Sequence, residues 1–171
     1  LMSAAKGGTP SGYWLSEEAY RADAACKAVA EKFAKTYDFV AAKEKYDKEL
    51  ARWKVEAEKA KAAGQKPPRA LTPPAPAGES PGKIGGLYEA HVRQFVGYGI
   101  RGVLWDQGEN GTKITGVDQF TLMGALIRGW RKEWGQGDFP FVYVQKPSGG
   151  GCAWDLSDPV TMKASEFAPL P

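Results

Sequence analysis

The 171-residue sequence contains one histidine, His91, and two cysteines, Cys26 and Cys152. A Ser-His-Asp site built from these residues alone would have to use His91. His91 falls inside an apparently amphipathic stretch, residues 87–97, which favours a packed or surface histidine. The cysteines form no CxxC pair and give neither a disulfide framework nor the spacing of a metal site, although they could pair with each other.

Long apolar runs and clustered charge are also lacking. No stretch approaches the ~20 apolar residues that cross a bilayer, and the first six residues lack the basic and apolar regions of a signal peptide. The formal net charge is only +3, and most Lys and Arg residues lie among Glu and Asp. Nucleic-acid-binding proteins show a basic patch instead. The composition therefore argues against a membrane span and against a nucleic-acid partner.

The first residues, Leu1 to Ala5, are small and apolar, and Gly7-Gly8-Thr9-Pro10 follows them. This pattern predicts a strand that enters a glycine turn, where the backbone can approach a ligand. A chain that begins on an apolar strand also predicts that the native protein continues upstream.

Residues 16–64 are predicted to form a helical hairpin inserted into the main domain. Ser16, followed by two glutamates, is a helix N-cap signal, and the first helix should run to about Lys35. A second helix, from about Val40 to Ala63, carries an apolar stripe opposite a face of Lys and Glu. The stripe consists of Tyr46, Leu50, Trp53, Ala57 and Ala60. This pattern favours an intramolecular insertion, with a protein contact of the hairpin as the alternative.

Residues 65–83 are rich in Pro, Ala, Gly and Ser, which predicts an extended linker. The following stretch, Leu87 to Gly97, is expected to be a helix. Its inward-facing residues should be Leu87, Val92 and Phe95.

The second half has the pattern of a βαβ unit. The unbroken apolar run from Ile100 to Trp105 predicts a strand buried on both faces. Residues 118–134 predict a helix, and 139–145 predict a second strand. This order favours an α/β fold with a parallel sheet. The helix should bury Phe120, Met123, Ile127, Trp130 and Trp134.

Two glycine-framed polar loops follow the predicted strands, Gly7-Gly8-Thr9 and Gln107-Gly108-Glu109. In open α/β sheets, ligands bind at the carboxyl ends of the strands. If the strands are neighbours, a backbone N–H of the first loop and the amide of Gln107 can converge on one developing oxyanion. Two ordinary tight turns are the alternative. Asp106 and Glu109 could also be the paired carboxylates of a glycosidase or part of a metal site, but carboxylates one turn apart on a single loop rarely flank a substrate.

These segments together resemble the sialate O-acetylesterase family of the SGNH hydrolases. The likeness is strong between Ile100 and Gln145, fair between Leu1 and Ser16, and poor across the helical and Pro-rich stretch, which looks like a family-variable insertion. It rests on Gly7-Gly8-Thr9-Pro10 with Trp14, Ile100-Arg-Gly-Val-Leu-Trp105 before Gln107-Gly-Glu109, and Leu126-Ile-Arg-Gly-Trp-Arg131 followed by Trp134-Gly-Gln-Gly-Asp-Phe-Pro-Phe141.

The resemblance implies a three-layer α/β/α SGNH-hydrolase fold of the flavodoxin-like type, of which residues 1–171 form an incomplete part. It implies hydrolysis of O-acetyl esters on an acetylated carbohydrate by a serine nucleophile, without metal or other cofactor. The family's nucleophile motif and its Asp-x-x-His base motif are not in this sequence, so both are expected outside it and the chain alone should be inactive. Relatives of this kind are often secreted or periplasmic.

The resemblance also implies roles for residues of this chain. Gly8, or Gly7, corresponds to a backbone oxyanion donor, and Gln107 to a side-chain donor. Glu109 would brace the loop. The substrate pocket would be shaped by Trp14, Trp105 and Asp106.

Several positions depart from the family pattern. Lys6 replaces a tryptophan, Asp106 stands where tyrosine is common, and Asn110-Gly111 replaces Ser-Asn. The acyl and sugar pockets are therefore expected to differ from those of the family. An inactive relative of the family is the alternative. The alternative from another class is a noncatalytic carbohydrate-binding or assembly module that uses the helical hairpin as its interaction surface.

Overall fold

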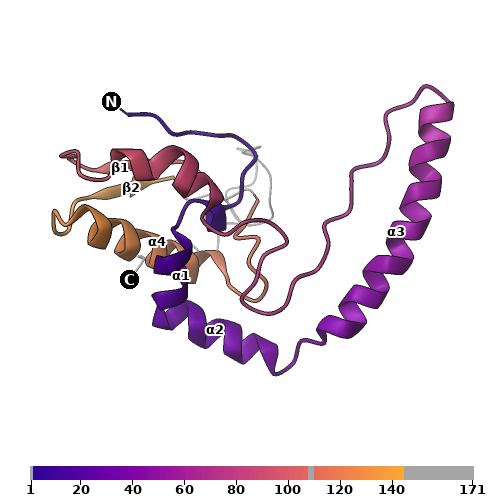
Figure 1. Ribbon diagram of the computed structural model, residues 1–171, viewed down its shortest axis with the longest axis horizontal. Helices are drawn as coiled ribbons and strands as arrows, with labels where there is room; N and C mark the ends of the chain where they lie inside the picture. Colours follow the sequence, from indigo (N-terminus) through magenta and orange to yellow (C-terminus); the bar gives the residue numbers. More distant parts are fainter. Residues whose placement is uncertain (1, 108–109, 145–171) are drawn as a thin grey trace, which may run out of the picture.

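The computed structural model describes residues 2–107 and 110–144. Figure 1 shows a body that holds most elements and an arm that projects from it. The arm is formed by one long helix and the segment that returns along it. The elements are, in chain order, η1 (Ser11–Tyr13), α1 (Glu17–Ala22), α2 (Ala24–Ala34), α3 (Phe39–Ala62), η2 (Tyr88–Val92), η3 (Arg93–Phe95), β1 (Val103–Trp105), α4 (Gln119–Trp134) and β2 (Phe141–Tyr143). The chain is thus a mixed helical and β structure.

The predicted βαβ unit is confirmed: β1 and β2 pair in parallel, with Leu104 opposite Val142, and α4 connects them. The prediction of a strand buried on both faces is wrong. Val103 and Trp105 pack on the core, whereas Leu104 is 79% exposed and Val142 is 60% exposed. Aromatic side chains of α4 cover one face of the sheet, and within the described ranges nothing covers the other.

Helix α4 forms the centre of the core. The carboxylate of Asp118 accepts a hydrogen bond from the backbone N–H of Thr121 at 2.8 Å, and Gly135 ends the helix in the left-handed conformation with φ of 62°. These are standard start and stop signals. Four of the five predicted core residues are buried, namely Met123, Ile127, Trp130 and Trp134. The fifth, Phe120, is 48% exposed because it lies in the first turn and lines an open pocket.

The first predicted helix is two helices. Ser16 caps α1, as expected, by accepting a hydrogen bond from the N–H of Ala19 at 3.2 Å. The single helix to Lys35 is wrong because Asp23 is extended, with ψ of 116°, and its carboxylate accepts from the N–H of Cys26 at 3.0 Å. Asp23 therefore ends α1 and starts α2, because a short carboxylate side chain competes for backbone N–H groups.

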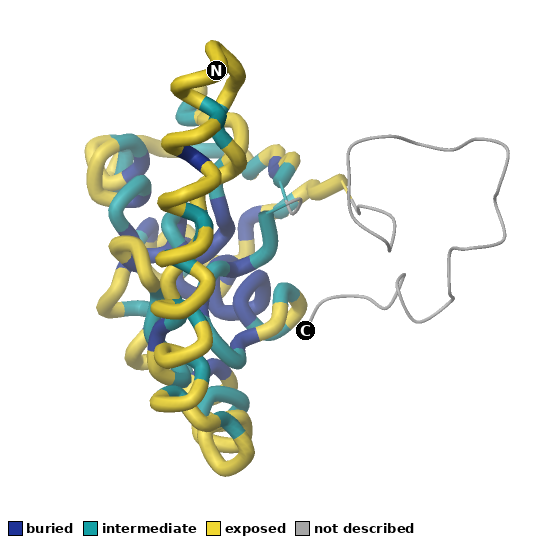
Figure 2. The backbone as a smooth tube through the Cα atoms, turned by 90° about the vertical axis from the view of Figure 1, so that its right-hand side faces the viewer, coloured by how far each residue is buried: buried dark blue, intermediate teal, exposed yellow. Residues whose placement is uncertain are grey.

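Helix α3 extends away from α2, so the predicted hairpin takes a different form. The chain returns along α3 as the Pro-rich segment, which has neither helix nor strand (Figure 1). The indole N–H of Trp53 donates to the carbonyl of Pro68 at 3.3 Å, and Ala57 is only 3% exposed. The outer face of α3 is exposed along its length (Figure 2). Of the predicted apolar stripe, Ala57 is therefore buried within the chain and the other four residues are half-buried.

Two further predictions need correction. Residues 2–6 form no strand, because no described strand lies beside them to pair with. The stretch 87–97 contains the π-helical turn η2 and the 3₁₀ turn η3 instead of an α-helix. The predicted inward-facing residues are nevertheless right: Val92 is buried, and Leu87 and Phe95 pack against the core.

Candidate active-site corner

The first loop exposes backbone where a ligand could approach. Gly8 has a φ of +72°, a conformation that glycine adopts without strain, and a β-carbon at Gly7 or Gly8 would meet no atom within 4 Å. Within the described residues, neither glycine donates its N–H group to a hydrogen bond. The turn therefore presents open space beside N–H groups that have no partner among the described residues.

The second loop reaches the first through Gln107. The side-chain Nε2 of Gln107 donates a hydrogen bond to the carbonyl oxygen of Thr9, across 98 positions of sequence. Thr9 is itself fixed, because its hydroxyl donates to the carbonyl of Lys6 at 2.8 Å and accepts from the indole N–H of Trp14 at 3.0 Å. We call Gly7, Gly8, Thr9 and Gln107 the corner. The sequence predicted that the two loops converge if their strands are neighbours, and it did not single out Thr9.

Backbone pairing beyond the corner holds the two segments side by side. The N–H of Ser11 donates to the carbonyl of Gly111 at 3.0 Å, and the N–H of Gly12 donates to the carbonyl of Thr112 at 3.1 Å. A β-carbon at Gly12 would lie 2.5 Å from the oxygen of Thr112. The close approach therefore depends on glycine at position 12.

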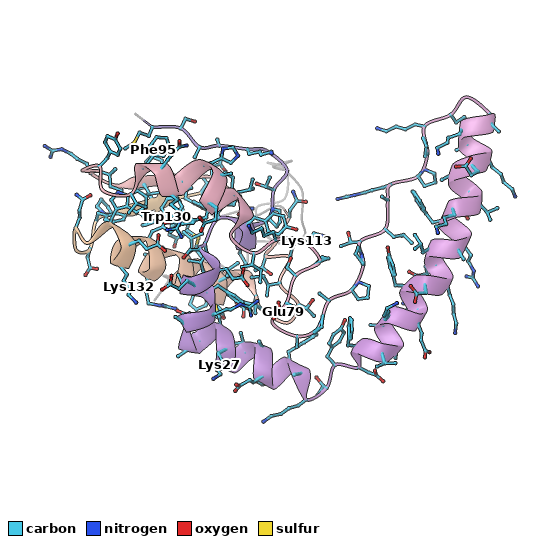
Figure 3. All side chains as sticks on the ribbon, viewed as in Figure 1. Lys27, Glu79, Phe95, Lys113, Trp130 and Lys132 are labelled. Carbon is cyan, nitrogen blue, oxygen red and sulfur yellow. The ribbon has the colours of Figure 1, made fainter. Side chains whose placement is uncertain are left out.

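Two tryptophans predicted to shape the substrate pocket lie beneath the corner. Trp14 is 5% exposed and Trp105 is 9% exposed, and their rings meet edge to face with centroids 6.4 Å apart. Trp105 also packs edge to face on Trp130 at 6.0 Å, and the indole N–H of Trp130 donates to the carbonyl of Trp14 at 3.0 Å. Figure 3 shows Trp130 in the middle of the body. Both tryptophans thus support the corner from the core side.

Of the two other predicted site residues, the structure describes Asp106. Asp106 is exposed, whereas its neighbours Trp105 and Gln107 are buried and half-buried, in keeping with the alternation of side chains along an extended strand. Glu109, the predicted loop brace, lies outside the described residues.

His91 lies closer to the corner than the sequence indicates. Its ring centroid is 6.2 Å from that of Trp14, with the planes tilted by 35°. The indole N–H of Trp14 in turn binds Thr9. No local pattern signals this contact, because residues 14 and 91 belong to different elements. The chain's one histidine is therefore a neighbour of the corner, although no described contact joins it to Gln107.

Two polar atoms near the corner are buried without a partner among the described residues. They are Oε1 of Gln107 and Nε1 of Trp105. An unsatisfied buried polar atom costs about 1–3 kcal/mol of stability. Among the described residues, the side chain of Gln107 therefore forms a hydrogen bond through its nitrogen and none through its oxygen.

The chain matches no family model, no curated protein and no solved structure.

The buried serine hydroxyls have structural partners. The hydroxyl of Ser11 donates to Oε1 of Gln119 at 2.8 Å, and that of Ser16 donates to Oε1 of Glu133 at 2.6 Å. Burial raises the pKa of Glu133. Neither serine is paired with an imidazole, which is the usual activating base for a serine nucleophile.

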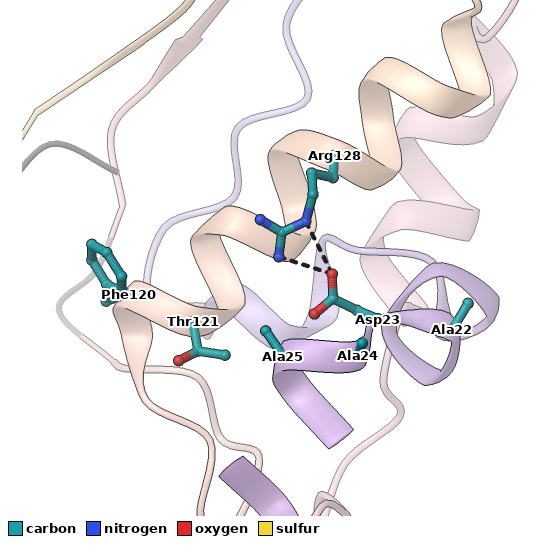
Figure 4. Close-up of a pocket in the computed structure, with 7 residues that line it drawn as sticks. All are labelled: Ala22, Asp23, Ala24, Ala25, Phe120, Thr121 and Arg128. Carbon is teal, nitrogen blue, oxygen red and sulfur yellow. Dashed lines mark hydrogen bonds and ion pairs between the residues drawn. The ribbon is translucent and has the colours of Figure 1, made fainter. Parts of the chain in front are cut away.

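A pocket of about 460 Å³ lies between the α1–α2 junction and α4 (Figure 4). Its charged groups are paired with each other: two nitrogens of Arg128 lie 2.9 and 3.1 Å from one oxygen of Asp23. Partial burial opposes ionisation of Asp23, but the N–H of Cys26 and the guanidinium of Arg128 outweigh it and lower the pKa of Asp23. The lining residues are Ala22, Asp23, Ala24, Ala25, Phe120, Thr121 and Arg128. None belongs to the corner.

Cys26 lies in the core beside this pocket and is a free thiol. It is fully buried, and burial, with the nearby Asp23 carboxylate, raises its pKa to about 12. A thiol with this pKa stays protonated near neutral pH and is a poor nucleophile. Within the described ranges, no group of three His, Cys, Asp or Glu residues is placed to hold a metal ion, and no helix is long and apolar enough to span a bilayer.

Proposed function

We propose that this chain is the oxyanion-stabilising part of a serine hydrolase that removes O-acetyl groups from carbohydrates, of the sialate O-acetylesterase type. The observation that carries the proposal is the hydrogen bond from Gln107 to Thr9, which joins the amide to the Gly7-Gly8 turn. The motif likeness supports the same family, and the parallel β1–α4–β2 unit is compatible with the α/β fold that the family implies.

The chemistry follows from the donors that remain at the corner. The amide of Gln107 carries two N–H bonds, and the carbonyl of Thr9 accepts from one of them. The other N–H, with the N–H of Gly8, is available for an oxygen that gains charge. Such fixed donors stabilise an oxyanion more than they stabilise the ground-state carbonyl.

In the proposed reaction, a serine hydroxyl attacks the acetyl carbonyl carbon while a histidine takes its proton. The carbonyl π electrons move to the oxygen, which the Gln107 amide and the Gly8 N–H would hold. Collapse of this intermediate breaks the ester bond, and the histidine returns the proton to the sugar oxygen. Water then releases acetate by the same steps. The motif likeness assigns the serine and this histidine to segments outside these 171 residues.

The outer face of the sheet is also compatible with a larger domain. Leu104 and Val142 lie opposite each other and are both exposed, whereas parallel sheets are ordinarily covered on both faces. In a three-layer domain, a further layer would cover this face, which no described residue covers.

The test is turnover of an aryl acetate by the longer protein that contains this chain and the serine and histidine motifs. We expect Gln107→Ala to lower kcat by roughly 10²–10³-fold, the usual effect of losing one oxyanion donor. Gln65→Ala, an exposed glutamine on the arm, is the matched control and should not change kcat. A loss of only a few-fold for Gln107→Ala would assign Gln107 to loop structure. Serine-dependent turnover by the 171 residues alone would contradict the placement of the nucleophile.

A second candidate function is a noncatalytic carbohydrate-binding or assembly module. It is favoured by the arm, which projects from the body with one face of α3 exposed (Figures 1 and 2). A longer protein that binds acetylated sugars but lacks the serine and histidine motifs would support this candidate over the esterase.

A further inference from the structure

The arm carries its charge unevenly. Residues 39–51, next to the body, contain three cations and three carboxylates, whereas residues 52–69 contain six cations and two carboxylates. The net charge of +4 on this second stretch, which we call the outer arm, exceeds the +3 of the whole chain. All six of its cationic residues are exposed. The positive charge of the protein is therefore concentrated on its most protruding part.

Ion pairs do not neutralise the outer arm. Near the body, Lys43 pairs with Asp47 at 2.9 Å and Lys45 approaches Glu49 at 3.9 Å. The outer arm has one pair, Lys61 with Glu58 at 2.9 Å. Its other five cationic residues form no ion pair with any described residue: Arg52, Lys54, Lys59, Lys66 and Arg69.

Helix geometry arranges part of this charge in a row. Lys48, Arg52 and Lys59 are separated by four and seven residues, so they lie on one side of α3, about 6 and 10.5 Å apart along its axis. We call these three residues the cation row. On a different face of α3, the indole of Trp53 holds Pro68 of the Pro-rich segment, which keeps that segment beside the helix.

We propose that the outer arm, with the cation row, binds an anionic polysaccharide. The inference rests on the proposed esterase function, because a polymer held there would be the substrate whose acetyl esters are presented to the corner. A polysaccharide with one carboxylate per sugar or per pair of sugars has charges several ångströms apart, which matches the spacing of the row. The electrostatic contact would hold the polymer while the corner acts on successive residues.

The same features disfavour other polyanions. Single-stranded nucleic acid is bound by exposed aromatic rings, and the aromatic residues of α3 are half-buried. A membrane-surface helix inserts its apolar face, but the residues of the α3 stripe are buried or half-buried, and Trp53 is bonded to Pro68.

The experiment measures binding of short, unacetylated polygalacturonate to this chain by calorimetry and by NMR, with maltodextrin of the same length as the neutral control. We expect polygalacturonate to shift the amides of residues 48–69 and its affinity to fall with added salt, because exposed charge pairs are screened. The variant Lys48→Gln/Arg52→Gln/Lys59→Gln should lose about tenfold in affinity, as expected for three exposed charge contacts. Equal binding of maltodextrin would overturn the proposal.

A matched control removes the same charge from the body. Lys27→Gln/Lys35→Gln/Lys132→Gln, at exposed positions of which Lys27 and Lys132 are marked in Figure 3, should bind polygalacturonate as the unchanged chain does. Lys66→Gln/Arg69→Gln, which lies outside any helix, should also weaken binding even if the helical variant loses structure. Equal losses in body and arm variants would overturn the proposal. Tighter arm-dependent binding of duplex DNA or phosphatidylserine vesicles would overturn it in favour of those partners.

Because the probe carries no acetyl ester, this result is independent of catalysis. Gln107→Ala should leave polygalacturonate binding unchanged while it lowers turnover in the longer protein. If polygalacturonate does not bind but turnover still depends on Gln107, the arm proposal alone would be rejected. Intact binding without Gln107-dependent turnover would reject the esterase proposal alone.

Discussion

Gly12 and Thr112 approach so closely that a β-carbon at position 12 would lie 2.5 Å from the Thr112 carbonyl oxygen. The backbone N–H of Gly12 donates to that same oxygen at 3.1 Å. Side chains of Ile114 occupy the remaining space, with atoms 2.9 Å from the position of the added carbon. This contact holds the segment after Thr9 against the segment after Gln107, so the corner depends on it.

Gly12→Ala should therefore separate the two segments. Inserting a methyl group into packed space costs about 1–3 kcal/mol, and we expect the free energy of unfolding in urea to fall by that amount. The side-chain amide signals of Gln107 should shift in NMR spectra because its contact with Thr9 is disturbed. Gly99→Ala is the control, since a β-carbon there meets no atom within 4 Å. Equal stability of the two variants would show that the loops tolerate separation.

Tyr88 and Tyr20 provide a matched pair of buried phenols. The Tyr88 hydroxyl is buried without a described partner, whereas the Tyr20 hydroxyl donates to the carbonyl of Gly78 at 2.7 Å. Tyr88→Phe should leave the free energy of unfolding unchanged or raise it by up to about 1 kcal/mol, because an unpaired group is removed. Tyr20→Phe should lower it by about 1 kcal/mol. Equal losses in urea unfolding would mean that Tyr88 has a partner.

Asp23 should contribute to stability in a pH-dependent way. Its pKa is lowered in the folded chain, so its contribution is present above the unfolded carboxyl pKa of about 3.9 and is lost as pH falls through the folded pKa. Asp23→Asn keeps a capping side chain but loses the charge. It should cost about 0.5 kcal/mol at pH 7, because Arg128 is partly exposed and exposed ion pairs contribute little. Asp23→Ala should cost about 1 kcal/mol more, through loss of the cap.

Urea unfolding of these variants at pH 7 and in acid tests whether the contribution of Asp23 to the free energy of unfolding decreases as the pH falls. The difference between the unchanged chain and Asp23→Asn should shrink towards zero as the pH falls below the folded pKa of Asp23. A difference that grows in acid would mean that the Asp23 carboxylate is not stabilised by Arg128 and Cys26.

Cys26 should be unreactive while the chain is folded. Its pKa of about 12 leaves very little thiolate at pH 8, so in a Cys152→Ser background we expect alkylation by iodoacetamide to be roughly a thousandfold slower than in urea. The reaction is followed by mass spectrometry. Similar rates with and without urea would show that α2 opens readily from α4.

The elements that the sequence predicts well are those with local signals. Helix α4 has a cap at Asp118, a glycine stop at Gly135 and an apolar period between them, and α3 has a clear stripe. The break at Asp23 was missed because an aspartate fits both an exposed helix position and an N-cap. The exposure of Leu104 could not be foreseen, because an apolar run says that a strand has two apolar faces but not whether both are covered.

The corner was predictable in outline and not in detail. The rule that ligand loops gather at the carboxyl ends of parallel strands predicted that the two loops converge if a strand precedes each of them. Residues 2–6 form no strand, and the hydrogen bond from Gln107 to Thr9 joins the loops instead. The acceptor role of Thr9 and the position of His91 beside Trp14 arise from tertiary packing between distant segments. Single-sequence patterns carry no information about such contacts. The roles of Glu109 and Asp106 stay predictions.

The bonds from Ser11 to Gly111 and from Gly12 to Thr112 close a loop of about one hundred residues that contains the whole arm. The entropy lost on closing a flexible loop rises only with the logarithm of its length, so doubling or halving the loop changes the free energy by about 0.6 kcal/mol. The corner is therefore thermodynamically almost indifferent to the length of the arm. A long insertion between these two hydrogen-bonded segments can therefore be gained, shortened or replaced without changing the positions of Gly8 and Gln107.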